Sequence, residues 1–159
     1  MATPTPAFVS HCMELLQPLG SVRSKRMFGG WGISTDGMNI AIIAWDTLFL
    51  KTNAETEPRW LAAGGRPFLY EAKGKSMKLN YHTPPDEALE SPALMLPWAR
   101  LALEAAVAAA NAVVEKAVRD GQVPGAELLI AVGGKLVQDR AFGFAELNDF
   151  DGRRLARPR

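Results

Sequence analysis

The stretch from Trp31 to Lys51 constrains the fold most, because its pattern predicts consecutive strands joined by tight turns. Asp36-Gly37 favours a two-residue hairpin turn between strands over Trp31–Thr35 and Met38–Trp45. The run Ile40–Ala44 is apolar at every position, which is typical of a strand covered on both faces. An antiparallel sheet is therefore expected at the centre of the fold.

Helical and further strand segments surround this centre. The hydroxyl and proline of Thr5-Pro6 predict a helix start. Asn53 is a plausible N-cap for a second helix, and Pro97 is expected to open a long third helix that ends near Asp120. The predicted helices cover Phe8–Leu19, Ala54–Ala63 and Pro97–Asp120, and the further strands cover Leu48–Lys51, Pro67–Glu71, Lys78–His82, Ala126–Val132 and Lys135–Phe144. The fold class is therefore α+β: a mainly antiparallel sheet with flanking helices, and a long C-terminal helix that leads to an extra β-hairpin.

Composition places the chain among soluble globular proteins. Of its 159 residues, 48% are hydrophobic and 22% are charged, which excludes an intrinsically disordered chain. Eighteen Lys and Arg against seventeen Asp and Glu give a net charge of +1, so bulk charge predicts neither a nucleic-acid nor a membrane partner. The single cysteine fits a reducing compartment, and the N-terminus lacks the pattern of a signal peptide. No apolar run is expected to be long enough to span a bilayer, so the predicted location is the cytoplasm.

No group of residues has the spacing of a known catalytic, cofactor or metal site. The chain's two histidines, His11 and His82, and its cysteine, Cys12, are too few and too scattered for a metal centre. Neither a Gly-x-Ser-x-Gly nor a Ser-x-x-Lys nucleophile motif occurs. Gly74-Lys75-Ser76 resembles the end of a phosphate-binding loop, but Leu69 stands where the first glycine is required. We therefore predict no catalytic, cofactor-binding or metal-binding residues, and a binding or regulatory module rather than an enzyme.

The most unusual stretch runs from Val22 to Gly32, where basic residues lead into aromatic residues and glycines. One interpretation is structural: Gly29 and Gly30 permit a bulge, a positive φ or a close backbone approach. The other is a basic, aromatic-edged surface for a partner. The candidate partner surface consists of Arg23, Lys25, Arg26, Phe28 and Trp31.

The same stretch carries a family resemblance. Residues 26–33, with the sequence Arg-Met-Phe-Gly-Gly-Trp-Gly-Ile, are similar to the signature of the TfoX/Sxy family N-terminal domain. Asp46–Lys51, Pro67–Tyr70 and Leu96–Arg100 agree with the family in order and spacing, so the resemblance covers residues 8–106. It implies an α+β domain without described catalytic residues. It also implies a link to regulators of natural competence, which act with the cyclic-AMP receptor protein at promoters.

The C-terminal part has a separate resemblance. Residues 112–151, with Val123-Pro124-Gly125 between a helix and a strand, look like the start of a serine beta-lactamase-related hydrolase, but the chain lacks that family's Ser-x-x-Lys nucleophile. We therefore expect a domain over residues 5–110. Residues 111–159 are expected to be an incomplete fragment of helix, hairpin and basic tail, joined by a fusion or frameshift.

Three functions stay open at this point. The favoured one is a non-enzymatic protein-interaction module that co-regulates transcription. The alternatives are a hydrolase fusion without its catalytic residues, and a direct nucleic-acid binder that uses Arg23, Lys25 and Arg26, which the near-zero net charge disfavours. We expect the hairpin either to dock on the N-terminal domain or to pair with the same hairpin of a second chain in a homodimer. The expected core of the domain consists of Phe8, Leu15, Leu16, Ile40, Ile42, Leu50 and Trp98.

Overall fold

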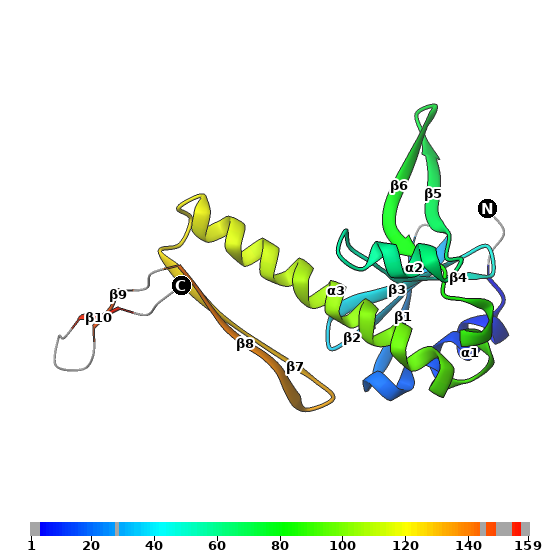
Figure 1. The fold of residues 1–159 in the computed structure, drawn as a ribbon, viewed down its shortest axis with the longest axis horizontal. Coiled ribbons are helices and arrows are strands. Elements are labelled where there is room, and N and C mark those ends of the chain that lie inside the picture. Colours follow the sequence, from blue (N-terminus) through cyan, green and yellow to red (C-terminus); the bar gives the residue numbers. More distant parts are fainter. Residues whose placement is uncertain (1–3, 28, 144–145, 149–153, 157–159) are drawn as a thin grey trace. The chain divides into compact units, whose positions relative to one another are not determined.

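The computed structural model describes residues 4–27, 29–143, 146–148 and 154–156. The chain divides into two compact units, Met1–Ala106 and Val107–Arg159, which share the long helix α3 (Pro92–Arg119). The first unit is built around a six-stranded antiparallel sheet with the strand order β1-β2-β3-β4-β6-β5 (Figure 1). Its strands are β1 (Val22–Met27), β2 (Gly30–Thr35), β3 (Met38–Ala44), β4 (Thr47–Lys51), β5 (Pro67–Ala72) and β6 (Lys75–His82). The predicted α+β fold class is confirmed.

Tight turns join the neighbouring strands as the sequence indicates. Asp36 and Gly37 connect β2 to β3 with φ values of 47° and 82°, which is the left-handed backbone that a two-residue hairpin turn requires. Lys73 and Gly74, with φ values of 53° and 75°, connect β5 to β6 in the same manner. Both strands are therefore longer than the predicted Pro67–Glu71 and Lys78–His82, and the turn between them is shorter. The resulting β5–β6 hairpin projects from the rest of the sheet (Figure 1).

Two of the three predicted helices differ from expectation at their starts. Helix α1 (Pro6–Leu16) begins as predicted, with Thr5 Oγ1 accepting a hydrogen bond from the backbone N–H of Phe8. Helix α2 (Glu57–Ala62) is shorter than predicted, because Asn53 Oδ1 accepts from the N–H of Thr56 in a turn that precedes the helix. Helix α3 begins at Pro92, because Ser91 Oγ caps the N–H of Leu94 and leaves Pro97 inside the helix. Two short 3₁₀ turns, Gln17–Leu19 and Asp86–Glu90, complete the helical elements of this unit.

The sheet carries apolar side chains on both of its faces. On one face the strands pack against α1, α2 and the first part of α3 in the main core, and we call this the helix-covered face. Four predicted core residues, Leu15, Leu16, Ile40 and Leu50, are at most 1% exposed there. The other face, which we call the open face, carries a second cluster made of strand residues alone, and Ile42 belongs to it.

The core prediction was incomplete around the helices. Phe8 and Trp98 are only partly buried, although they pack against the main core. Trp60 and Met95 are fully buried and were not predicted. Trp60 lies on α2, and its ring centroid is 4.9 Å from that of Trp98. Trp60 therefore occupies the interior position, and the partly buried Trp98 packs against it.

Helix α3 meets a length and composition test for a membrane span, although it contains no uninterrupted apolar run of the length that was considered in the sequence. It contains an 18-residue window with a mean hydropathy of 1.4, so it passes the length and composition test for a membrane span. The mean hydropathy is high because the helix is rich in alanine, which is apolar although its side chain is small. Ala99, Ala102 and Ala106 of this helix are buried in the core of the first unit. A helix that packs in a core passes the same test, so the finding assigns no location.

The second unit combines the end of α3 with a β-hairpin. Strands β7 (Gly125–Val132) and β8 (Lys135–Gly143) pair antiparallel around Gly133-Gly134, as predicted. The side-chain amides of Asn111 on α3 and Gln138 on β8 exchange two hydrogen bonds, of 2.8 and 2.6 Å. A second pair of short strands, β9 (Glu146–Asn148) and β10 (Arg154–Ala156), follows.

Candidate functional site

The predicted basic surface lies on β1, an edge strand of the sheet. The register pairs Lys25 with Gly32 and Met27 with Gly30. Because side chains alternate along a strand, Arg23 and Lys25 share the open face with Met27, while Arg26 lies on the other face. The guanidinium of Arg26 lies 5.7 Å from the ring centroid of Trp31, its partner across the ladder. The predicted surface is therefore divided between the two faces of the sheet, and Phe28 lies outside the described residues.

Gly29 and Gly30 differ in what their positions require. Gly29 has a φ of 79°, in the left-handed region that favours glycine. Gly30 lies in β2, and a Cβ there would stand 2.3 Å from the carbonyl oxygen of Ile43 on β3. The first position needs glycine for its backbone conformation, and the second needs it for the close approach of a neighbouring strand.

The open face contains an apolar hollow of about 500 Å³, which we call the sheet groove. None of the side chains that line it carries a charge. Phe68, at 7% exposure, forms part of its floor, whereas Met27 and Leu79 at its border are 40% and 37% exposed. The groove is lined by Met27, Gly30, Trp31, Ile42, Ile43, Ala44, Phe68, Tyr70, Leu79 and Tyr81.

Aromatic rings form a continuous cluster next to the groove. Phe68 packs edge-on against Phe49, with centroids 5.0 Å apart, and is stacked with Trp45 at 5.6 Å. Tyr81 accepts a hydrogen bond at Oη from the side-chain amide of Asn39, and Lys51 Nζ lies 5.7 Å from its ring centroid. The rings are therefore held in place by contacts with their own neighbours in the sheet.

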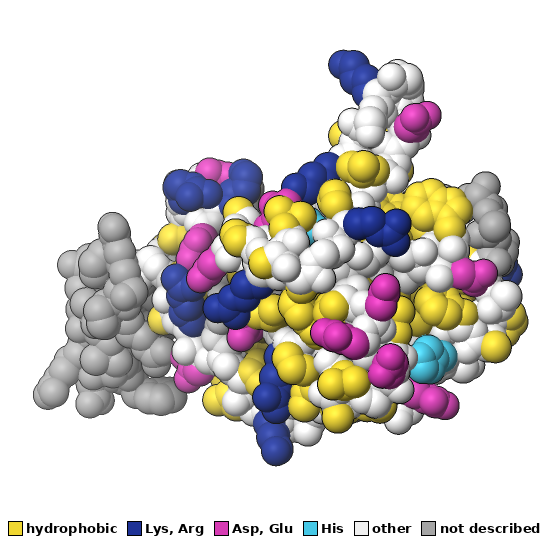
Figure 2. Space-filling model, turned by 45° about the vertical axis from the view of Figure 1, so that its right-hand side comes forward, with side chains coloured by type: hydrophobic (Ala, Val, Ile, Leu, Met, Phe, Trp, Pro, Cys, Tyr) yellow, Lys and Arg dark blue, Asp and Glu magenta, His cyan; other side chains and the backbone are white. Residues whose placement is uncertain are grey.

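Basic residues predominate on the sheet although the whole chain is nearly neutral. The only acidic residue in the six strands is Glu71. Figure 2 shows hydrophobic side chains gathered at the base of the projecting β5–β6 hairpin, and both basic and acidic side chains toward its tip. The bulk charge therefore hides a segregation of charge. The strands carry six basic residues: Arg23, Lys25, Arg26, Lys51, Lys75 and Lys78.

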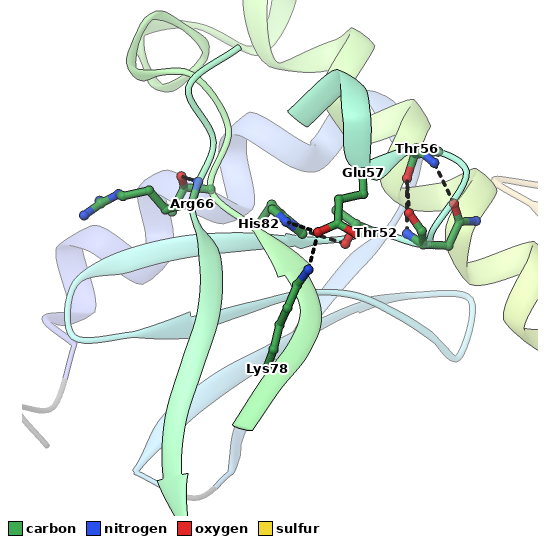
Figure 3. A network of polar contacts seen from close by, with 8 residues as sticks. Thr52, Thr56, Glu57, Arg66, Lys78 and His82 are labelled. Carbon is green, nitrogen blue, oxygen red and sulfur yellow. Dashed lines mark hydrogen bonds and ion pairs between the residues drawn. The ribbon is translucent and has the colours of Figure 1, made fainter. Parts of the chain in front are cut away.

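On the helix-covered face, a polar network joins β4, β6 and α2 (Figure 3). His82 is fully buried, and its Nδ1 lies 2.9 Å from Thr52 Oγ1. Its Nε2 lies 3.4 Å from Glu57 Oε1, a long contact, and Lys78 Nζ forms an ion pair with the same carboxylate. The neutral tautomer that carries its proton on Nε2 directs that N–H toward the carboxylate, which only accepts, and lets Nδ1 accept from the Thr52 hydroxyl.

The electrostatics of this network favour a neutral imidazole beside an ionised carboxylate. Burial lowers the pKa of His82, and the nearby Glu57 carboxylate opposes that shift only in part. The hydrogen bond from Lys78 lowers the pKa of Glu57. Since the imidazole is sealed from solvent, we interpret the network as a link between the sheet and α2. Sequence reasoning missed it, because 25 positions separate Glu57 from His82 and neither stands in a motif.

Comparison with protein families gives a match over residues 14–106 to the TfoX N-terminal domain. The match covers more than half of the chain. This protein belongs to the TfoX N-terminal domain family. The comparison with curated proteins gave no match.

The TfoX N-terminal domain corresponds to the first compact unit. The family match ends at Ala106, the residue at which that unit also ends. It contains the sheet groove, the aromatic cluster and the polar network. The predicted likeness of residues 112–151 to a serine beta-lactamase-related hydrolase has no support from these comparisons. The membership places the chain with a family linked to competence regulation.

The histidines and the cysteine of this TfoX N-terminal domain do not form a metal or catalytic site in the part of the chain that the structure describes. Among the described residues, no group of three His, Cys, Asp or Glu side chains is arranged to hold a metal ion. His11 Nε2 lies 2.8 Å from the carbonyl oxygen of Leu89, which fixes its ring against the 3₁₀ turn. Cys12 is fully buried, and burial raises the pKa of its thiol to about 12, so the thiolate that acts as a nucleophile does not form at neutral pH.

Proposed function

We propose that this protein is a non-catalytic regulatory module that acts by binding another protein in the cytoplasm. Its family is linked to competence regulation. The family resemblance further suggests, as a partner, a transcription regulator of the cyclic-AMP receptor protein type. In this proposal the chain contributes to promoter control as a co-regulator, without acting on a substrate.

The observation that carries the proposal is the sheet groove. Apolar residues at the surface of a sheet are costly to leave in water, and a contiguous patch of them marks an interaction site. Met27 and Leu79 border the groove and remain about two-fifths exposed. The lining offers no acid, base or nucleophile besides two tyrosine hydroxyls, one of which already accepts from Asn39. These properties suit binding better than catalysis.

Direct binding to duplex DNA is a second candidate, because the strands carry six basic residues and one acidic residue. A DNA-binding surface places Lys and Arg side chains against successive phosphates, and its affinity for DNA falls steeply as the salt concentration rises. Here Lys78 is paired with Glu57, and Arg26 lies over Trp31. Fewer cations are therefore available than the count suggests, which is why we favour a protein partner.

The test is a titration of the full chain with cyclic-AMP receptor protein, with and without cyclic AMP, followed by isothermal calorimetry. We expect binding with a Kd below about 100 µM, the range of a transient regulatory contact. Leu79→Lys should weaken it by about tenfold or more, because a charge is introduced at the groove border. Leu69→Lys is the matched control, since Leu69 is 51% exposed on the same hairpin and alternates to the opposite face.

Two results would contradict the proposal. No heat with the receptor protein in either nucleotide state would exclude this partner. Salt-sensitive binding of fluorescent duplex DNA, unchanged when the receptor protein is added, would favour the nucleic-acid function instead.

A further inference from the structure

We propose that the sheet groove binds an acidic amphipathic helix of a protein partner, with the apolar stripe of the helix in the groove and its carboxylates against Lys25 and Lys51. The proposal rests on the proposed function, because it names the kind of segment that a protein partner would present. It adds a geometry and a charge pattern that family membership does not supply.

The geometry favours a helix as occupant. A sheet with apolar side chains buries them against another layer, and helices are the layer that the opposite face of this sheet already uses. The cluster on the open face contains strand residues only, so no described helix of the first unit covers it. An added strand would pair at a sheet edge through its backbone and would leave the groove unfilled.

The charge around the groove selects an acidic partner. The groove lining is uncharged. Lys25 shares the open face with Met27 at one side, and Lys51 lies over the ring of Tyr81 at another. The sole acidic residue of the strands, Glu71, alternates away from Phe68 and Tyr70 and so leaves the open face basic. A basic helix would meet like charges there, and an acidic one would be attracted.

The covered ring faces disfavour single-stranded nucleic acid as occupant. Such ligands bind by stacking bases on free aromatic faces. Phe68 is stacked with Trp45 and only 7% exposed, and Tyr81 has Lys51 over its ring. These two rings therefore already have a neighbour on one face, which leaves less surface on which bases could stack.

Trp45 provides a second and independent observation. It lies in the turn between β3 and β4 with a φ of 52°, a conformation that a bulky residue rarely adopts. Its side chain is 42% exposed and stacks on Phe68, which forms part of the groove. Strained residues cluster at binding sites, and half-exposed tryptophans are common anchors of protein interfaces. We therefore expect Trp45 to contact the bound helix.

Selection from a phage library of random peptides about 12 residues long, about three helical turns, tests the proposal without knowledge of the partner. The immobilised full chain is the bait. We expect enriched peptides to carry net negative charge and apolar residues at helical spacing. Synthesised with a fluorescent label, they should bind Leu79→Ser about tenfold more weakly than Leu69→Ser, because only the first change removes an apolar contact of the groove and neither adds a charge. The double variant Lys25→Glu, Lys51→Glu should lose a similar factor and most of the salt dependence.

Several outcomes would overturn the proposal. They are enrichment of neutral or basic peptides, no enrichment over an uncoated support, equal binding to the Leu79 and Leu69 variants, and a fluorescent oligothymidylate that binds the wild type but not Leu79→Ser. Circular dichroism of each variant checks that it is folded. Failure of the receptor-protein titration leaves this selection intact, because the selection assumes no particular partner, so the two proposals fail separately.

Discussion

Alanine at position 30 would force two central strands apart. The added Cβ would stand 2.3 Å from the carbonyl oxygen of Ile43, whereas ordinary contact begins at 3.4 Å. The obstacle is backbone in β3, so it cannot rotate away as a side chain would. Overpacking of this kind costs about 1–3 kcal/mol, and alanine recovers about 0.5–1 kcal/mol because glycine loses more backbone entropy on folding. Because the obstacle is backbone, the overpacking cost lies at the upper end of its range, about 3 kcal/mol, and after the offset we expect Gly30→Ala to lower the free energy of unfolding by about 2 kcal/mol.

Gly32 in the same strand provides the matched control. A Cβ there would meet Met27 Sδ at 2.8 Å and Asn39 Oδ1 at 3.1 Å, which are the ends of side chains that can move. Gly32→Ala should therefore stay within about 1 kcal/mol of the wild type. Urea unfolding followed by tryptophan fluorescence measures both, because all four tryptophans lie in the first unit. If the free energy of unfolding of Gly30→Ala is within about 0.5 kcal/mol of the wild-type value, the close-approach argument is wrong. It is also wrong if Gly30→Ala and Gly32→Ala lower the free energy of unfolding equally.

Three further perturbations test other parts of the molecule. Burial lowers the pKa of His82 in the folded chain, so on acidification the unfolded chain binds a proton at this histidine before the folded chain does. The free energy of unfolding should therefore fall as the pH drops below 6.5. His82→Gln should remove this dependence, so its urea midpoint should change less with pH in the same range. An unchanged slope would contradict this. Cys12, whose thiol pKa is raised to about 12, should react with a thiol reagent only across the unfolding transition, and fast labelling of the native chain would refute its burial. Asn111→Ala and Gln138→Ala should each lower the free energy of opening of the hairpin, measured by amide hydrogen exchange, and the loss in the double variant should differ from the sum of the single losses by about 1 kcal/mol. Additive losses would show that the two side-chain amides are not coupled.

Much of the fold followed from short-range signals. Asp36-Gly37 specified a turn because few residues accept the left-handed backbone at both positions. The start of α3 was misplaced, because Pro97 has the features of a first-turn residue, and so does Pro92. Only Ser91, which caps the N–H of Leu94, decides between the two. Where two prolines both fit the start of a helix, the contacts of the folded chain determine which one is used, and the sequence pattern alone does not predict it.

The candidate site was far less predictable. The sheet order places β6 between β4 and β5, which brings Tyr81 beside Lys51 and Phe68 beside Leu79. Sequence reasoning singled out the basic residues Arg23 and Lys25, because they lie two positions apart in one short stretch of sequence. It did not find the groove, whose lining comes from five strands that no spacing rule connects.

Strand β3 connects the sequence pattern with the proposed function. Its run Ile40–Ala44 predicted cover on both faces. Helices pack over Ile40 and Ile43, whereas Ile42 and Ala44 belong to a cluster that, among the described residues of the first unit, contains strand residues alone. An antiparallel strand that faced water on one side would alternate with polar residues there, and β3 does so only at Asn39. The apolar character of the open face therefore exceeds what the folded unit itself requires, and a helix from a partner is the kind of layer that would account for it.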